Sequence, residues 1–216
     1  MRDPRPIFLL ACAVACAAPA KPPRAPPPSP PQARVVTGLE DATDFVRIYE
    51  HDTTDPENAM PTVGGYVRVH APIAVAYDVA TRFGEYRDLN PDYIEQSTVV
   101  DRHPEIDATD VYLKVPTVIR DYVWAVVRFR PVRKGPGGYA YRGDEVDGNL
   151  DDLRIYWRIV PAGPRDTIAQ FEFLADPHLP LPRAWILPEV REGVRIILNR
   201  YQQKAEAEAA RTQLFF

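Results

Sequence analysis

Apolar and polar residues alternate along much of the chain between residues 44 and 175, which is the pattern of β-strands with one buried face. Val123, Ala125, Val127 and Phe129, for example, fall on one face of a strand. Because the two faces of such strands differ in polarity, we expect an antiparallel sheet with one solvent-exposed face. The pattern predicts eight strands, over residues 44–52, 62–71, 94–102, 109–115, 122–132, 139–143, 153–160 and 167–175.

A period of 3.6 residues replaces this alternation in two places. Residues 73–83 follow Pro72, which is favourable in a first helical turn, and are predicted to form a helix, followed by a short helix or turn at 85–93. Residues 188–211 are predicted to form one long helix. We expect an α+β fold in which this last helix covers the apolar face of the sheet, because it carries the only large apolar stripe available. The stripe comprises Leu187, Val190, Val194, Ile197, Leu198, Tyr201 and Ala205.

The first 34 residues differ in composition from the rest and contain ten of the 24 prolines. Arg2 and Arg5 precede the apolar residues 7–15, and this arrangement predicts a secretory signal peptide over residues 1–15. The apolar run is shorter than the roughly 20 residues that span a bilayer. Residues 16–34 are predicted to form a stiff proline-rich tether, followed by one domain over residues 35–216.

Both cysteines of the chain, Cys12 and Cys16, lie at the end of this apolar run. A cysteine in this place resembles the lipobox of bacterial lipoproteins, whose thiol receives a lipid. The resemblance implies lipidation at Cys16, with Cys12 and plain cleavage without a lipid as alternatives. It also implies a periplasmic protein of the bacterial cell envelope that is held to a membrane by its N-terminal lipid.

Charge and residue types exclude several other function classes. With 26 Lys and Arg against 30 Asp and Glu, the net charge of −4 argues against a nucleic-acid partner. No cysteine follows Cys16, so disulfides and cysteine-based metal sites are excluded from the domain. The four histidines lack metal-ligand spacing, and the acidic run 144–152 lacks the ligand pattern of an EF-hand. We therefore expect neither a metal nor a cofactor.

Residues suited to catalysis are few. The chain lacks the GxSxG motif of serine hydrolases, and the inferred inward faces of the last four long strands carry no titratable group. A tyrosine in such a place more often orients a ligand or closes a hydrogen bond than catalyses, so a binding protein is favoured over an enzyme. The polar groups expected near the inner face are Tyr49, Tyr139 or Tyr141, Arg142 and Tyr201.

The order of elements is two strands, short helices, six strands and a long C-terminal helix, and it resembles the START-like helix-grip superfamily over about residues 44–212. This superfamily includes START lipid-transfer domains and polyketide cyclase-like proteins. The local features that carry the resemblance are His70-Ala71-Pro72-Ile73, Arg120-Asp121-Tyr122, Trp157 with Pro161 and Thr167, Asp176-Pro177, and Leu181-Pro182.

In that superfamily a curved antiparallel sheet wraps around the last helix and leaves an elongated apolar cavity. The inward-facing Ala125, Ala169 and Ala175 are compatible with such a cavity and equally with a closely packed helix, so both alternatives stay open. The resemblance implies the following ligand-binding residues: Val111, Leu113, Val115, Val127, Phe129, Trp157, Phe171, Phe173, Val194, Leu198 and Tyr201.

The function implied is the non-catalytic binding or transfer of a lipid or another hydrophobic small molecule. One alternative is a cyclase/dehydratase-type enzyme that acts on an aromatic or polyketide-like substrate, and it predicts a Tyr-Arg or Tyr-His pair at the cavity. Another alternative is a protein-interaction module whose cavity has collapsed.

Overall fold

The computed structural model describes residues 42–52, 60–116, 122–150, 152–176 and 182–213. Contacts divide the chain into residues 1–35 and a unit of residues 36–216, and every described residue belongs to the second unit. The predicted signal peptide, the tether and both cysteines lie outside the described residues. Among the described residues, no helix combines the length and the apolar character that crossing a membrane requires.

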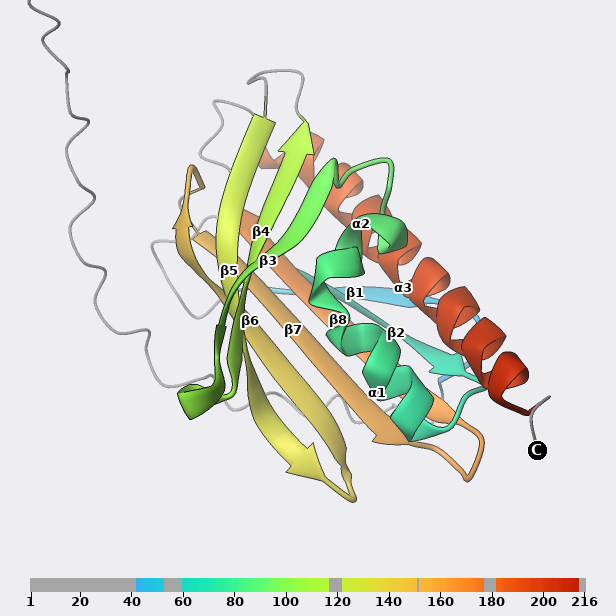
Figure 1. The fold of residues 1–216 in the computed structure, drawn as a ribbon. Helices are drawn as coiled ribbons and strands as arrows, with labels where there is room; N and C mark the ends of the chain where they lie inside the picture. The colour runs from blue at the N-terminus through green and yellow to red at the C-terminus, as the bar shows by residue number, and fades with distance from the viewer. Residues whose placement is uncertain (1–41, 53–59, 117–121, 151, 177–181, 214–216) are drawn as a thin grey trace, which may run out of the picture. The chain divides into compact units, whose positions relative to one another are not determined.

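Eight strands form one antiparallel sheet in the order β1-β2-β8-β7-β6-β5-β4-β3 (Figure 1). Strands that follow one another along the chain pair as neighbours, except β2 and β3: β3 lies at the far edge of the sheet, and β2 pairs with β8 instead. The strands are β1 Arg47–His51, β2 Thr62–Val69, β3 Gln96–His103, β4 Ala108–Pro116, β5 Tyr122–Gly135, β6 Gly138–Gly148, β7 Asp152–Pro161 and β8 Thr167–Asp176.

The helices α1 (Ile73–Thr81), α2 (Tyr86–Leu89) and α3 (Arg183–Gln213) lie on one face of this curved sheet (Figure 1). Two 3-10 turns, Phe83–Glu85 and Pro104–Ile106, complete the described secondary structure. The architecture confirms the predicted α+β fold, in which a curved antiparallel sheet wraps around a long C-terminal helix and short helices follow the second strand.

Two boundaries differ from the sequence prediction by five residues, and the others differ by less. The last helix begins at Arg183, before the predicted start at residue 188, so Pro188 lies inside it. A proline there lacks the N–H that would donate to the carbonyl four residues earlier, so one main-chain hydrogen bond of the helix is missing at this place. The sixth strand continues to Gly148 rather than ending at residue 143. Its acidic residues are compatible with a strand because Asp144 pairs with Arg130 on β5 and with Arg142 on β6 itself.

Alternation along the strands divides the sheet into two faces as predicted. On β5, Val123, Ala125, Val127 and Phe129 are buried, and the residues between them are half-buried or exposed. The helix α3 packs closely on β2, since a Cβ atom on Gly65 would lie 2.8 Å from Cδ1 of Leu198. Glycine at this position therefore sets how near the last helix comes to the sheet.

Candidate ligand-binding site

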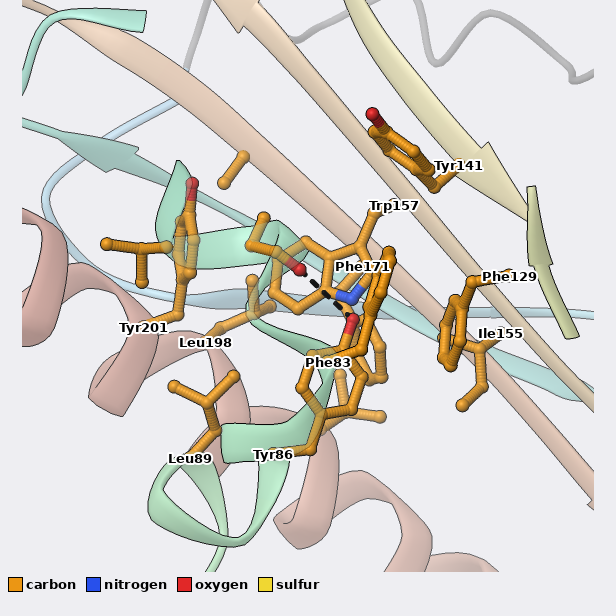
Figure 2. Packing of buried hydrophobic residues seen from close by; sticks show 14 of the residues in the cluster. Phe83, Tyr86, Leu89, Phe129, Tyr141, Ile155, Trp157, Phe171, Leu198 and Tyr201 are labelled. Carbon is orange, nitrogen blue, oxygen red and sulfur yellow. Dashed lines mark hydrogen bonds between the residues drawn. The ribbon is translucent and has the colours of Figure 1, made fainter. Parts of the chain in front are cut away.

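The middle of the space between sheet and helices is filled by aromatic side chains (Figure 2). The ring of Trp157 on β7 lies between Phe171 on β8 and Tyr201 on α3, with centroid distances of 4.7 and 4.9 Å. Beside this group, Phe83 stacks on Phe129 at 4.4 Å. These rings leave no room for a ligand at the centre of the sheet.

Two tyrosine hydroxyls in this packed region donate hydrogen bonds to main-chain carbonyls. Tyr201 donates to the carbonyl of Ala76 on α1 at 2.7 Å, and Tyr86 donates to the carbonyl of Ala80 at 3.2 Å. Burial raises the pKa of both phenols above the ordinary value, so both remain neutral hydrogen-bond donors. The sequence predicted that Tyr201 lies near the inner face, and its hydrogen bond to Ala76 there connects α3 to α1.

A cavity of about 220 Å³ lies at one end of the same space. Its wall is formed by α2 and the turn after it, by β4, β5, β7 and β8, and by the first half of α3. The domain is thus filled at its centre and hollow at one end, so each of the two alternatives left open by the sequence holds for part of the inner space. The lining residues are Tyr86, Asn90, Tyr93, Ile94, Leu113, Val115, Val123, Trp124, Ala125, Leu150, Leu153, Ile155, Phe171, Phe173, Ala175, Ile186, Glu189, Val190, Gly193, Val194 and Ile197.

Small residues explain why this end is hollow. Ala125 on β5 and Ala175 on β8 line the cavity, and Gly193 on α3 leaves the helix surface bare there. The third inward alanine, Ala169, does not line it and is fully buried. The same residue type therefore makes space in one place and allows close packing in another, which is why the sequence could not decide between the two.

The predicted ligand-binding residues divide between these two regions. Leu113, Val115, Phe171, Phe173 and Val194 line the cavity. The remaining predicted residues lie in the packed core outside the lining, because alternation assigns a side chain to a face without fixing its position along that face. They are Val111, Val127, Phe129, Trp157, Leu198 and Tyr201. That the five lining residues bind a ligand remains a prediction.

Sequence reasoning missed several lining residues. Val190 and Ile197 belong to the predicted apolar stripe of the last helix and could have been named from it. Ile186 precedes the predicted helix start, and Asn90 lies within the short helix or turn predicted at residues 85–93. No local pattern distinguishes such residues, since a loop and a helix meet there only in the folded chain.

The other polar groups expected near the inner face lie outside the lining. Tyr49 is on the opposite face of the sheet, where its hydroxyl donates to Glu172 at 2.7 Å. The hydroxyls of Tyr141 and Tyr77 bond to each other, and Tyr139 packs on Tyr77. Arg142 donates to Asp144 at 2.7 Å. None of these side chains can reach a ligand in the cavity.

Only one lining residue carries a formal charge, and it is paired. Tyr93 donates to the carboxylate of Glu189 at 2.7 Å, and both side chains are exposed to solvent at the rim. This hydrogen bond is the main reason why the pKa of Tyr93 is raised to about 12. Among the residues described, no group of three or more histidine, cysteine, aspartate or glutamate side chains could hold a metal ion.

The sequence of this domain matches a known protein family. A family described as polyketide cyclase/dehydrase and lipid transport matches residues 69–198, which is more than half of the chain. The chain belongs to this polyketide cyclase and lipid-transport family. Comparison with curated proteins gives no match.

Solved structures share the fold of this family member. The STAR-related lipid transfer protein of Xanthomonas axonopodis is 16% identical, with a TM-score of 0.62 over 75% of this chain and 94% of that one. Human STARD10 is 11% identical, with a TM-score of 0.62 over 78% and 72% of the two chains. The ZhuI aromatase/cyclase of Streptomyces sp. R1128 is 18% identical, with a TM-score of 0.52 over 75% and 94%. Sequence identities this low establish a common fold only.

Proposed function

We propose that the domain binds a lipid or another hydrophobic small molecule in the cavity between the sheet and α3, without chemical conversion. The observation that carries this proposal is the composition of the wall, which is apolar except at a few positions. Burial of apolar surface stabilises a complex by about 25 cal/mol per Å², so such a wall is sufficient for binding. The family description names both polyketide cyclase/dehydrase and lipid transport, so it supports binding of a hydrophobic molecule and is equally compatible with the enzyme alternative.

The described wall of the cavity has few side chains that could catalyse a cyclase-type reaction. General acid–base catalysis needs a titratable side chain within hydrogen-bond reach of the substrate. Within the part of the wall that the structure describes there is no arginine, lysine or histidine. The hydroxyl of Tyr86 is bound to a main-chain carbonyl, and the hydroxyl of Tyr93 to Glu189. Among the described residues of the wall, the pair that the enzyme alternative predicts is therefore not found.

Native mass spectrometry tests the binding function. The chain from residue 17 onward is made without detergent, incubated with an organic extract of bacterial membranes and transferred intact to the gas phase. We expect an added mass that organic solvent releases and that Ala125→Leu, which fills the cavity, abolishes. An unchanged mass with every fraction of the extract contradicts the proposal, and a chemically altered molecule released from the protein favours the enzyme.

The proposed place of action is the bacterial cell envelope, where the mature chain is tethered by a lipid on Cys16. Arg2, Arg5 and the apolar residues 7–15 support export, and the proline-rich residues 16–34 support a spacer between membrane and domain. We expect radiolabelled fatty acid to enter the wild-type protein and the Cys12→Ser variant but not the Cys16→Ser variant. Label in all three proteins, or in none, contradicts lipidation at Cys16.

A further inference from the structure

Asn90 is the one asparagine in the wall of the cavity, and it is only 3% exposed. Its main chain is fixed at the end of α2, where its N–H donates to the carbonyl of Arg87 at 3.1 Å and its carbonyl accepts from the N–H of Ile94 at 2.8 Å. Within the described chain, the side-chain oxygen Oδ1 has no hydrogen-bond partner. The side chain of a residue with a fixed main chain therefore belongs to an apolar wall and has its acceptor unused.

Such an arrangement is unfavourable unless something else satisfies the amide. Buried polar atoms are nearly always hydrogen-bonded, because leaving one without a partner loses the bond it made with water. The other polar side chains that line the cavity on the helical side, Tyr86, Tyr93 and Glu189, have partners within the chain. Asn90 is thus the lining residue that is left for a polar atom of a ligand.

Gly193 on α3 gives a second, independent indication. A Cβ atom there would lie 3.7 Å from Nδ2 of Asn90, which is an ordinary contact distance, so alanine would fit. Glycine in the interior of a helix is less favourable than alanine. The bare position beside the amide keeps open a space that a Cβ atom would reduce.

We propose that Asn90 recognises the single hydroxyl or N–H group of an otherwise apolar ligand, an inference that rests on the proposed binding function. A hydroxyl beside Asn90 can donate to Oδ1 and accept from Nδ2. The cavity volume limits the ligand further. An engineered cavity of about 150 Å³ holds benzene, so by proportion a volume near 220 Å³ holds about nine non-hydrogen atoms. The class of ligand is a compact, apolar molecule with one hydroxyl, or the hydroxylated end of a longer chain.

The test compares two probes of nearly equal shape that fit the cavity volume, 4-ethylphenol and 4-ethyltoluene, which differ only in that one carries a hydroxyl where the other carries a methyl group. Their affinities are measured by isothermal titration calorimetry for the chain from residue 17 onward and for Asn90→Leu, which keeps the size of the side chain. In the wild type we expect the affinity ratio of ethylphenol to ethyltoluene to exceed that of the variant by about tenfold, the effect of one buried hydrogen bond. Asn199→Leu, the same substitution on α3 outside the lining, should leave the ratio unchanged.

Gly193→Ala provides a variant that keeps Asn90 and needs no rearrangement of the fold. We expect it to weaken both probes while the melting temperature rises, because alanine stabilises the helix. If both probes bind and Asn90→Leu leaves their ratio unchanged, the role of Asn90 is wrong while the binding function stands. If neither probe binds the wild type, the binding function and this inference both fail.

Discussion

Trp157 is 1% exposed and has ring neighbours from a strand and from the last helix. The alternation of β7 places its side chain on the inner face, and the family resemblance implied a ligand contact. The position of Phe171 and Tyr201 on either side makes it part of the core instead. At the scale of one residue, the face was predictable and the neighbours were not.

Truncation distinguishes a core residue from a wall residue. We expect Trp157→Ala to lower the free energy of unfolding by about 3–5 kcal/mol, because the packed rings cannot close the void it leaves. Phe173 is half-buried and already lines the cavity, so Phe173→Ala only enlarges an existing space. We expect it to lower the free energy of unfolding by clearly less than Trp157→Ala does. Urea denaturation of both variants measures the difference, and equal losses would contradict the division into packed and hollow regions.

His70 should make stability depend on pH. Its ring nitrogens lie 2.7 Å from Asp166 and 3.2 Å from Asp44, and its main-chain N–H donates to Glu206. The hydrogen bond with Asp166 is the main cause that raises the pKa of His70. The stabilisation is therefore complete below the unfolded pKa of about 6.5 and is lost as pH rises through the folded pKa.

We expect His70→Gln to lower the free energy of unfolding at pH 6 and to have a smaller effect at pH 9, where the wild-type ring is neutral. Urea denaturation of both proteins at the two pH values measures this. A loss that is the same at both values would mean that His70 acts by shape and not by charge.

At the scale of elements, a buried carboxylate joins three strands on the outer face of the sheet. Asp110 on β4 accepts two hydrogen bonds from Arg128 on β5, at 2.8 and 2.7 Å, and lies 3.0 Å from Nε2 of His103 on β3. The bonds from Arg128 are the main cause that lowers the pKa of Asp110. Because a bidentate pair is directional, it fixes the register of this sheet edge as well as adding stability.

Loss of this arginine should cost more than loss of its neighbour on the same strand face. We expect Arg128→Gln to lower the free energy of unfolding by about 1–3 kcal/mol at pH 7, because Asp110 stays buried. The effect should shrink as pH falls through the folded pKa of Asp110. Arg130→Gln removes an exposed pair with Asp144 and should cost less than about 1 kcal/mol. Equal losses in chemical denaturation would contradict the role of Asp110.

At the scale of the whole molecule, the inner space is partitioned between packing and cavity. Phe83 and Tyr86, which follow α1, insert their rings against Phe129 and so fill the centre. Toward the start of α3 the wall includes Ala125, Ala175 and Gly193, and a cavity remains between the sheet and the helix. The binding capacity of the domain depends on this partition rather than on any single motif.

Two identical substitutions test the partition. We expect Ala125→Leu, at the cavity wall, to change the free energy of unfolding by less than about 1 kcal/mol and to block ligand uptake. Ala169→Leu, in the packed region, should lower it by about 1–3 kcal/mol through overpacking. Thermal and urea unfolding together with a probe-binding titration check both. Equal destabilisation would show that the end near Ala125 is also filled.

Most of the fold follows from local pattern. The alternation of Val123 to Phe129 predicted a strand and its buried face, and the stripe from Val190 to Ala205 predicted the helix that covers the sheet. Strand ends were less certain, because Asp144 reads as a turn residue until Arg130 and Arg142 are known to lie beside it. The site was only partly predictable, since the wall combines strand residues with Asn90 and Gly193, which no periodicity marks.

The sequence by itself determined the class of structure, because side-chain direction alternates along a strand and repeats every 3.6 residues along a helix. Both periods are local, so the inner and outer faces could be assigned before the fold was known. Only the tertiary structure decided where the inner face is filled and where it is hollow. That outcome depends on which side chains of α1, α2 and α3 meet each point of the sheet, and such contacts join residues far apart in the chain.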